Sequence, residues 1–225
     1  LPASLVREIT GPLREAGWRP FLFDSPVAYP GPRRTPEKYL KAAAGHGFTP
    51  EAMECPIVIS DRSRAVPGKH LTYGICEDLL AAQGVLFLSH VKGHFCTGFG
   101  GALKNLGMGG MNAATKGAIH GGGKPEWGGD CDGCGACAAR CPTGHIAMEN
   151  GQAVFKKTFC VGCSNCVHYC PAGALRPRNA SFDTLLLEGI GLAMNLLPPT
   201  VWVNAVIRIS RHCDCCADAG EQVAP

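Results

Sequence analysis

Two short runs hold eight of the fourteen cysteines of this 225-residue chain, and they restrict its fold more than any other feature. The runs read CDGCGACAARCP and CVGCSNCVHYCP, and both have the spacing C-x2-C-x2-C-x3-C-P. Each cysteine of the second run follows its counterpart by 29 residues, and the likeness continues in CPTGHI and CPAGAL. Self-similarity at a fixed period indicates an internal duplication. The segment is therefore expected to contain two similar halves.

The spacing of the cysteines is typical of ligands to iron–sulfur clusters. Three thiolates on one tight loop can hold three corners of a [4Fe–4S] cluster, whereas the fourth cysteine of each run ligates the other cluster. Zinc is the alternative, but zinc ribbons use two CxxC pairs rather than a triple followed by Cys-Pro. The pattern predicts cluster 1, held by Cys131, Cys134, Cys137 and Cys170, and cluster 2, held by Cys160, Cys163, Cys166 and Cys141.

The segment from about Gly129 to Arg176 resembles bacterial two-cluster ferredoxins. The resemblance implies an α+β ferredoxin-like module inserted at residues 125–178. Free ferredoxins of this kind are strongly acidic, but four acidic and five basic residues lie between Glu126 and Arg178. A near-neutral module is expected to be docked to its own chain or to a subunit instead of diffusing freely. We therefore expect a redox partner protein or subunit.

Strand and helix patterns alternate outside the cysteine-rich segment. Helices are expected at residues 5–16, 37–44, 75–82 and 181–197, with Pro36 opening the second. The strand candidates are RPFLFD, CPIVIS, VLFLS and TVWVNAVIRIS, and RAVPGKHLT reads as a hairpin or loop. VLFLS is continuously apolar, which favours a buried strand. The alternation predicts an α/β domain with a mostly parallel sheet flanked by helices, discontinuous over residues 1–124 and 179–225.

A glycine-rich segment, SHVKGHFCTGFGGALKNLGMGG, begins at the last residue of that strand and covers residues 89–110. It lacks the Gly-Lys pair of a phosphate-binding loop and the third glycine of a dinucleotide fingerprint. The strand would end at His90, and ligands of open α/β sheets bind beyond the carboxyl ends of strands. A helix that begins near Gly101 would present free N–H groups to an anion. The alternative is that the glycines form tight turns and that both histidines are structural.

Three stretches carry a second resemblance: LSHVKGHFCTGFGGALKNLGMGG, SPVAYPGPRRTPEKYLKAAAGHGF and the CDCC near the end. In this order they are similar to the iron–sulfur proteins of domain-of-unknown-function family 362. The family implies no reaction, and its members usually extend further at both ends, so we expect a truncated chain. Its motif maps onto candidate catalytic and ligand-binding positions. The catalytic candidates are His90, Lys92, His94 and Lys104, and the binding candidates are Gly98, Gly100, Gly101 and Asn105.

The remaining cysteines give weaker signals. The stretch RHCDCC offers a possible third metal site, at His212, Cys213, Cys215 and Cys216, or else buried thiols in an oxidation-prone tail. Cys55, Cys76 and Cys96 are isolated and are expected to act as small buried hydrophobes. Cys96 is the exception to watch, because it lies inside the glycine-rich segment.

Composition narrows the class of protein. A net charge of +3 does not indicate nucleic-acid binding, and clustered cysteines in a chain of this length favour a reducing, anaerobic cytoplasm over a disulfide scaffold. The longest apolar stretch contains Glu188, Asn195 and a Pro-Pro pair, which makes it a poor membrane span. We expect an iron–sulfur electron-transfer protein, either an oxidoreductase component with a further metal or small-molecule site on the α/β domain or a docking subunit. The third possibility is a non-redox role, in which the clusters only stabilise the fold of a binding module. The sequence leaves the oligomeric state open.

Overall fold

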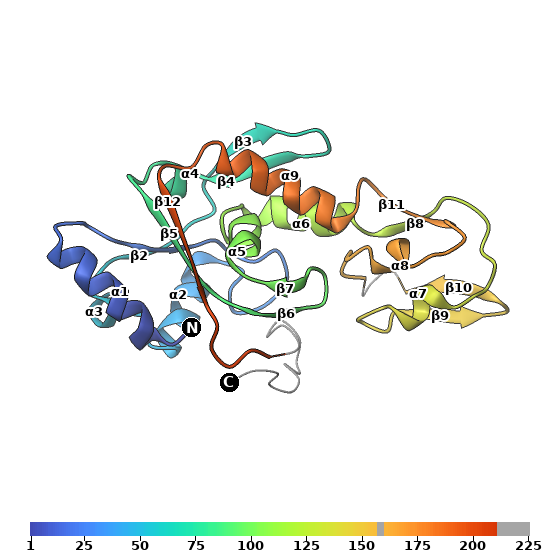
Figure 1. Cartoon of the computed structure of the whole chain (residues 1–225), viewed down its shortest axis with the longest axis horizontal. Coiled ribbons are helices and arrows are strands. Elements are labelled where there is room, and N and C mark those ends of the chain that lie inside the picture. Colours follow the sequence, from blue (N-terminus) through green and yellow to red (C-terminus); the bar gives the residue numbers. More distant parts are fainter. Residues whose placement is uncertain (157–159, 211–225) are drawn as a thin grey trace.

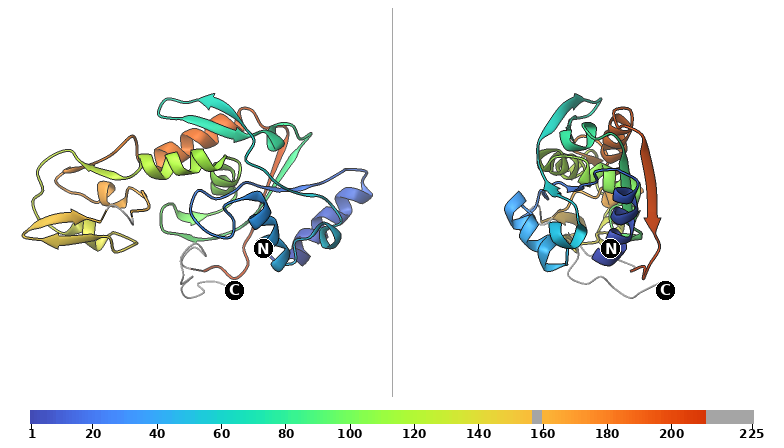
Figure 2. Two further views of the ribbon diagram at one scale, coloured as in Figure 1. Left: turned by 180° about the vertical axis from the view of Figure 1, so that it is seen from behind. Right: turned by 90° about the vertical axis from the view of Figure 1, so that its left-hand side faces the viewer.

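The computed structural model describes residues 1–156 and 160–210, and it has a mixed α/β fold. Figures 1 and 2 show an elongated molecule with the cysteine-rich segment at one end and the other elements gathered into a body. Within the described residues the strands pair two by two, giving two parallel and four antiparallel pairs. The expected single, mostly parallel sheet is therefore wrong, although the α/β class is confirmed.

The two parallel pairs lie in the body. β1 (Leu22–Asp24) pairs with β2 (Ile57–Ile59), and β5 (Val85–His90) pairs with β12 (Thr200–Ala205). β12 follows the cysteine-rich segment and returns to the body, as the sequence predicted. β5 is only half-buried, because α5 covers the face of Phe87 and Ser89 whereas Leu86 on the opposite face is 38% exposed. The expectation of a buried strand is wrong, since only Ser89 of β5 is fully buried, although Leu88 on the opposite face packs against a small cluster of Val6, Met53 and Cys55.

Three helices flank the β1–β2 pair. They are α1 (Ala3–Glu15), α2 (Pro36–Gly45) and α3 (Pro50–Met53). Thr35 and Thr49 cap the last two, each accepting a hydrogen bond from a backbone N–H three residues on, and each is followed by proline. Val6 of α1 packs with Met53 and Cys55 in a small buried cluster. The helices predicted at residues 5–16 and 37–44 are confirmed.

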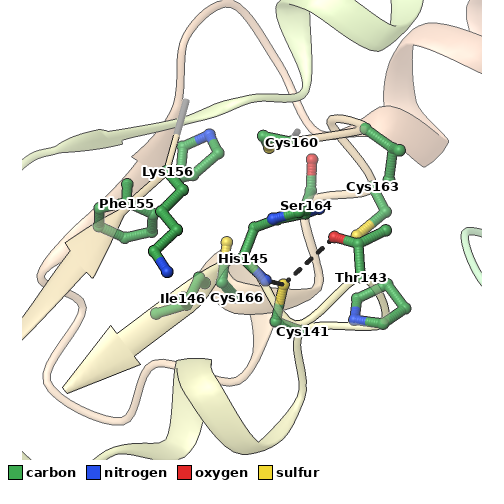
Figure 3. Close-up of a pocket in the computed structure, with 13 residues that line it drawn as sticks. Cys141, Thr143, His145, Ile146, Phe155, Lys156, Cys160, Cys163, Ser164 and Cys166 are labelled. Carbon is green, nitrogen blue, oxygen red and sulfur yellow. Dashed lines mark hydrogen bonds between the residues drawn. The ribbon is translucent and has the colours of Figure 1, made fainter. Parts of the chain in front are cut away.

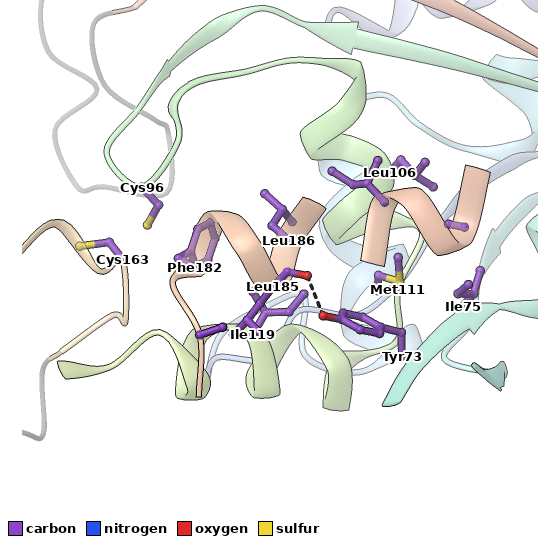
Figure 4. Close-up of a cluster of buried hydrophobic side chains, with 13 residues drawn as sticks. Tyr73, Ile75, Cys96, Leu106, Met111, Ile119, Cys163, Phe182, Leu185 and Leu186 are labelled. Carbon is purple, nitrogen blue, oxygen red and sulfur yellow. Dashed lines mark hydrogen bonds between the residues drawn. The ribbon is translucent and has the colours of Figure 1, made fainter. Parts of the chain in front are cut away.

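The main core joins a β-hairpin to three helices (Figure 4). Its elements are β3 (Ser63–Pro67), β4 (Thr72–Cys76), α5 (Ala102–Gly109), α6 (Ala113–Gly122) and α9 (Phe182–Met194). Tyr73 is fully buried there and donates to the Leu185 carbonyl at 2.8 Å. The predicted helix 75–82 is too long, because Ile75 and Cys76 pair with β3 and the helix α4 covers only Glu77–Leu80.

The cysteine-rich segment leaves the body through β8 (Pro125–Trp127) and returns through β11 (Leu175–Pro177), which pair antiparallel. Between them lie two one-turn helices and a β-hairpin: α7 (Ala136–Ala139), β9 (Ile146–Glu149), β10 (Gln152–Phe155) and α8 (Asn165–His168). Its small core contains Cys137, Ala153, Cys166 and Leu175. Within the described residues, no helix is long and apolar enough to cross a bilayer.

Candidate cluster sites and the glycine-rich hairpin

The two cysteine runs have the same backbone conformation. Gly133 and its counterpart Gly162 both have left-handed φ angles, +74° and +68°. Gly144 and Gly173, which follow the Cys-Pro pairs, also have matching φ angles, +63° and +64°. Each run forms a loop that holds its first two cysteines and leads into a one-turn helix that holds the third. The duplication seen in the sequence is thus a duplication of local structure.

Two cavities lie between these loops, and cysteines line both. The first is lined by the four cysteines assigned to cluster 2, namely Cys141, Cys160, Cys163 and Cys166 (Figure 3). The second is lined by the four cysteines assigned to cluster 1, namely Cys131, Cys134, Cys137 and Cys170. Each cavity therefore combines three cysteines of one run with the last cysteine of the other.

Backbone N–H groups point at cysteine sulfurs in both loops. Gly133 donates to Cys131 Sγ and Gly162 to Cys160 Sγ, each at 3.4 Å, and His145 donates to Cys141 Sγ at 3.4 Å. Such donors stabilise a thiolate relative to a thiol. Burial acts in the opposite direction, and it raises the pKa values of Cys137 and Cys160 and that of Cys166 to about 12. A metal bound here would have to displace protons from these thiols.

The four thiols around each cavity do not converge on one point. Within the described residues, no three His, Cys, Asp or Glu side chains lie close enough together to hold a single metal ion. Zinc requires such convergence, because its four ligands lie about 2.3 Å from one centre. A [4Fe–4S] cluster holds its thiolates at the corners of a cube, and so it suits a more open set of cysteines.

The loop of cluster 2 is fitted tightly against the body. A Cβ atom on Gly162 would lie 1.7 Å from the carbonyl oxygen of His120 in α6. The His120 Nδ1–H donates to the Val161 carbonyl at 2.7 Å, and Ser164 donates its hydroxyl to the Gly123 carbonyl at 2.8 Å. Burial lowers the pKa of His120, which favours the neutral ring. The end of α6 thus fixes the position of the second cysteine loop.

The glycine-rich segment forms a hairpin that its sequence did not reveal. β6 (Lys92–His94) pairs antiparallel with β7 (Gly98–Gly100), and His94 lies opposite Gly98. The predicted boundaries on either side are confirmed: β5 ends at His90, and α5 begins just after Gly101. The hairpin therefore extends beyond the carboxyl end of β5, at the edge where ligands of α/β proteins bind.

Several of the candidate ligand-binding residues have structural partners. His90 contacts the Ile207 carbonyl through Nε2, and Asn105 donates to Ser89 Oγ at 2.7 Å. The Asn204 side chain accepts from the Ala102 N–H at 3.0 Å, so it occupies the start of α5 where an anion was expected. The absence of a side chain at Gly101 makes room for that amide, because a Cβ would lie 3.0 Å from Asn204 Oδ1.

His94 is held by its own hairpin. It is 7% exposed, its ring stacks on Phe95 with centroids 5.2 Å apart, and its Nδ1 accepts from the Cys96 N–H at 3.2 Å. Nδ1 therefore carries no proton. Lys92 lies at the start of β6. The side chain of Lys104 lies over Gly100 of β7, because a Cβ atom added to Gly100 would be 3.6 Å from Lys104 Cδ. Lys92 and His94 thus lie on the hairpin itself, and Lys104 lies beside it on α5.

The turn of the hairpin contacts the loop of cluster 2. Cys96 is 5% exposed, and it lies in the main core cluster together with Cys163, one of the four cysteines of the cluster 2 cavity (Figure 4). Asn165 donates its side-chain amide to the Phe95 carbonyl at 3.2 Å. The neighbouring Cys163 thiol and burial both raise the pKa of Cys96. The sequence marked Cys96 only by its place among the glycines, and it gave no sign of Asn165 or His120.

The predicted third metal site lies outside the described residues. His212, Cys213, Cys215 and Cys216 all follow residue 210. The structure therefore does not place them, and the third site stays a prediction.

The fold and the two cavities define a mixed α/β protein with a duplicated, cysteine-lined segment. The chain belongs to the family described as domain of unknown function DUF362, whose model matches residues 2–225. No curated protein and no solved structure matches it.

Proposed function

We propose that this protein binds two [4Fe–4S] clusters and relays electrons between a redox partner and its α/β body. The observation that carries the proposal is the division of eight cysteines between two cavities. Each cavity receives three cysteines of one run and the fourth of the other, which is the ligand exchange expected of two-cluster ferredoxins. A pair of independent zinc sites has no need of this exchange.

The residues present suit such clusters. Both donor sets consist of thiols, N–H groups aim at their sulfurs, and the thiols surround open space. The clusters would supply one-electron transfer, and the chain would supply the ligands, the N–H donors and the exclusion of water. Hydrogen bonds and solvent exposure are the features by which a protein sets cluster potentials.

The position of each cavity suggests a route. Cys134 in the cluster 1 cavity is exposed, so an external partner can approach that cluster. Cys163 and Cys166 in the cluster 2 cavity are buried, and their loop contacts α6 and the glycine-rich hairpin. Electrons would pass between the partner, cluster 1, cluster 2 and the body.

Two roles for the body fit this route. In the first, the hairpin carries a ligand or metal, and the protein is an oxidoreductase component of a reducing, anaerobic cytoplasm. The arrangement of His94, Lys92 and Lys104 about one turn favours this role. In the second, the body is a docking platform in a larger redox complex. A small molecule or additional metal that co-purifies with the protein supports the first role, and a stoichiometric partner with its own redox centre supports the second.

Metal analysis of anaerobically purified protein tests the proposal. We expect about eight irons and eight sulfides per chain, and electron paramagnetic resonance (EPR) signals of two clusters after reduction with dithionite. Cys170→Ser should perturb cluster 1 and Cys141→Ser cluster 2, because each removes the ligand that crosses from the other run. About four irons per chain, bound zinc, or clusters that no low-potential donor can reduce would contradict the proposal.

A further inference from the structure

β12 is the outermost strand of its sheet, and one of its two edges has no strand partner. It pairs with β5 over six consecutive residues without a bulge, from Thr200 opposite Val85 to Ala205 opposite His90. Among the strands that the structure describes, no other pairs with β12. In the right-hand view of Figure 2, β12 lies at the margin of the molecule. Its outer edge is therefore open to another strand.

The hydrogen bonds to β5 show which backbone groups of β12 face outward. The N–H groups of Val85 and Val91 donate to the carbonyls of Pro199 and Ala205, each at 3.0 Å. Successive residues of a strand direct their backbone groups to alternate sides, so the odd-numbered residues of β12 face β5. The even-numbered residues direct their N–H and C=O groups to the outer edge, and they are Thr200, Trp202 and Asn204. Unpaired edge groups of this kind form a template for pairing with another chain.

The segment 200–207 lacks the features with which proteins usually prevent such pairing. Edge strands are normally protected by charged side chains, by proline within the strand or by a bulge. The sequence TVWVNAVI has no charged residue and no proline, and its register with β5 is unbroken. The next charged residue is Arg208, which has a left-handed φ of +47°. Val201 and Val206 are 57% and 63% exposed. An exposed, uncharged and regular edge predicts association.

A second copy of the chain suits this edge because the edge is complementary to itself. In an antiparallel pair about a two-fold axis, Trp202 lies opposite its own counterpart, and Thr200 lies opposite Asn204 of the second copy. The outward backbone groups of both strands then meet in hydrogen-bonded pairs. On the face away from α5, Val201 lies opposite Val203 of the second copy, and pairs of β-branched side chains stabilise antiparallel strands. Since the segment 200–207 is uncharged, no like charges meet across the axis.

We propose that two copies of this chain associate through the outer edges of β12 and form one continuous sheet in the order β5–β12–β12–β5. The antiparallel arrangement places the carboxyl ends of the two β5 strands at opposite ends of the joint sheet. The glycine-rich hairpins that follow these strands are therefore far from the two-fold axis, and each copy keeps its own candidate site. The inference goes beyond the proposed function and does not depend on the clusters.

Sedimentation equilibrium of the whole, anaerobically purified chain over a micromolar concentration series tests the inference. We expect a monomer–dimer equilibrium that reaches the mass of two chains. Hydrogen exchange followed by mass spectrometry should show amide protection of residues 200–204 that increases with concentration, because dimerisation pairs the outward N–H groups. Val201→Lys places a charge against Val203 of the second copy and should weaken the dimer by about tenfold or more. Val201→Thr keeps a β-branched residue without a charge and should remain dimeric.

Leu187→Lys is the matched control, because Leu187 is exposed to a similar extent, 59%, but lies on α9. It should leave the association unchanged. A chain that is monomeric throughout the series would overturn the inference, and so would a dimer that Leu187→Lys dissociates and Val201→Lys does not. If circular dichroism shows that Val201→Lys fails to fold, hydrogen exchange of the wild type decides. Protection of residues 200–204 that increases with concentration supports the inference, and a dimer without it overturns the inference.

Discussion

Lys116 shows how one buried charge holds the body beneath the candidate sites together. Lys116 is 6% exposed on α6, and its ammonium group donates to the Ser25 carbonyl at 3.0 Å, to Ser25 Oγ at 2.7 Å and to the Pro26 carbonyl at 2.7 Å. Burial lowers the pKa of Lys116, and the nearby charge of Asp24 opposes that shift. The lysine thus ties the end of β1 to the helix that also fixes the second cysteine loop. The sequence offered no sign of this role, because a lysine within a helix pattern is usually solvated.

Replacement of Lys116 by methionine should destabilise the protein strongly. The variant keeps the apolar stem but leaves the acceptors of Ser25 and Pro26 buried without a donor, which is expected to remove about 2–4 kcal/mol of stability. Thermal unfolding followed by circular dichroism measures the effect. Lys41→Met, at an exposed position of α2, is the matched control and should change stability little. Equal effects of the two substitutions would show that the buried contacts of Lys116 contribute nothing.

Local signals predicted some elements well and others poorly. α2 was predicted from Pro36 at its start, and α9 from a long helix-like run. The structure adds that Thr35 and Ser181 cap these two helices. The β6–β7 hairpin was missed because four of the nine residues from Lys92 to Gly100 are glycine or histidine with no strand preference of their own. The proposed assignment of the eight cysteines to two clusters was made from their spacing alone and stays a prediction. Contacts across the chain, such as Cys96 with Cys163, have no such local signature.

The fit between the second cysteine loop and α6 predicts an unequal response to two similar glycine substitutions. Gly162 and Gly173 both have left-handed φ angles, +68° and +64°, so alanine strains the backbone at either position. Only at Gly162 would the new Cβ also collide, at 1.7 Å, with the His120 carbonyl, whereas nothing lies within 4 Å at Gly173. Gly173→Ala is expected to lose about 1–2 kcal/mol and to retain both clusters. Gly162→Ala should unfold at lower temperature still and lose iron from cluster 2.

Iron analysis and thermal unfolding of the two variants measure the difference. Because the backbone strain is matched, any excess in Gly162→Ala reports the contact with α6. Similar iron contents and unfolding temperatures would mean that the loop moves away from α6 without consequence, and this would contradict the tight docking of the second loop.

At the scale of the whole molecule, the duplicated halves face different surroundings. The loop of cluster 1 has an exposed cysteine, Cys134, and the loop of cluster 2 is enclosed by α6, α9 and the hairpin, with Cys163 and Cys166 only 8% and 6% exposed. The sequence predicted two equivalent sites, because its repeat is nearly symmetric. The asymmetry comes from the body, which covers only one of them. A relay between a partner and a buried site requires such a difference, since one cluster must be reachable and the other shielded.

This asymmetry predicts the order in which the clusters are lost. Oxidants in solution attack the more accessible cluster first, because burial of the ligand sulfurs and of the cluster slows their approach. Brief treatment of the anaerobically purified protein with ferricyanide should therefore lower the iron content from about eight toward about four per chain. The EPR signals that remain should be those that survive in Cys134→Ser, which identifies them as cluster 2. Loss of both clusters at one rate, or of cluster 2 first, would show that the body does not shield the second site.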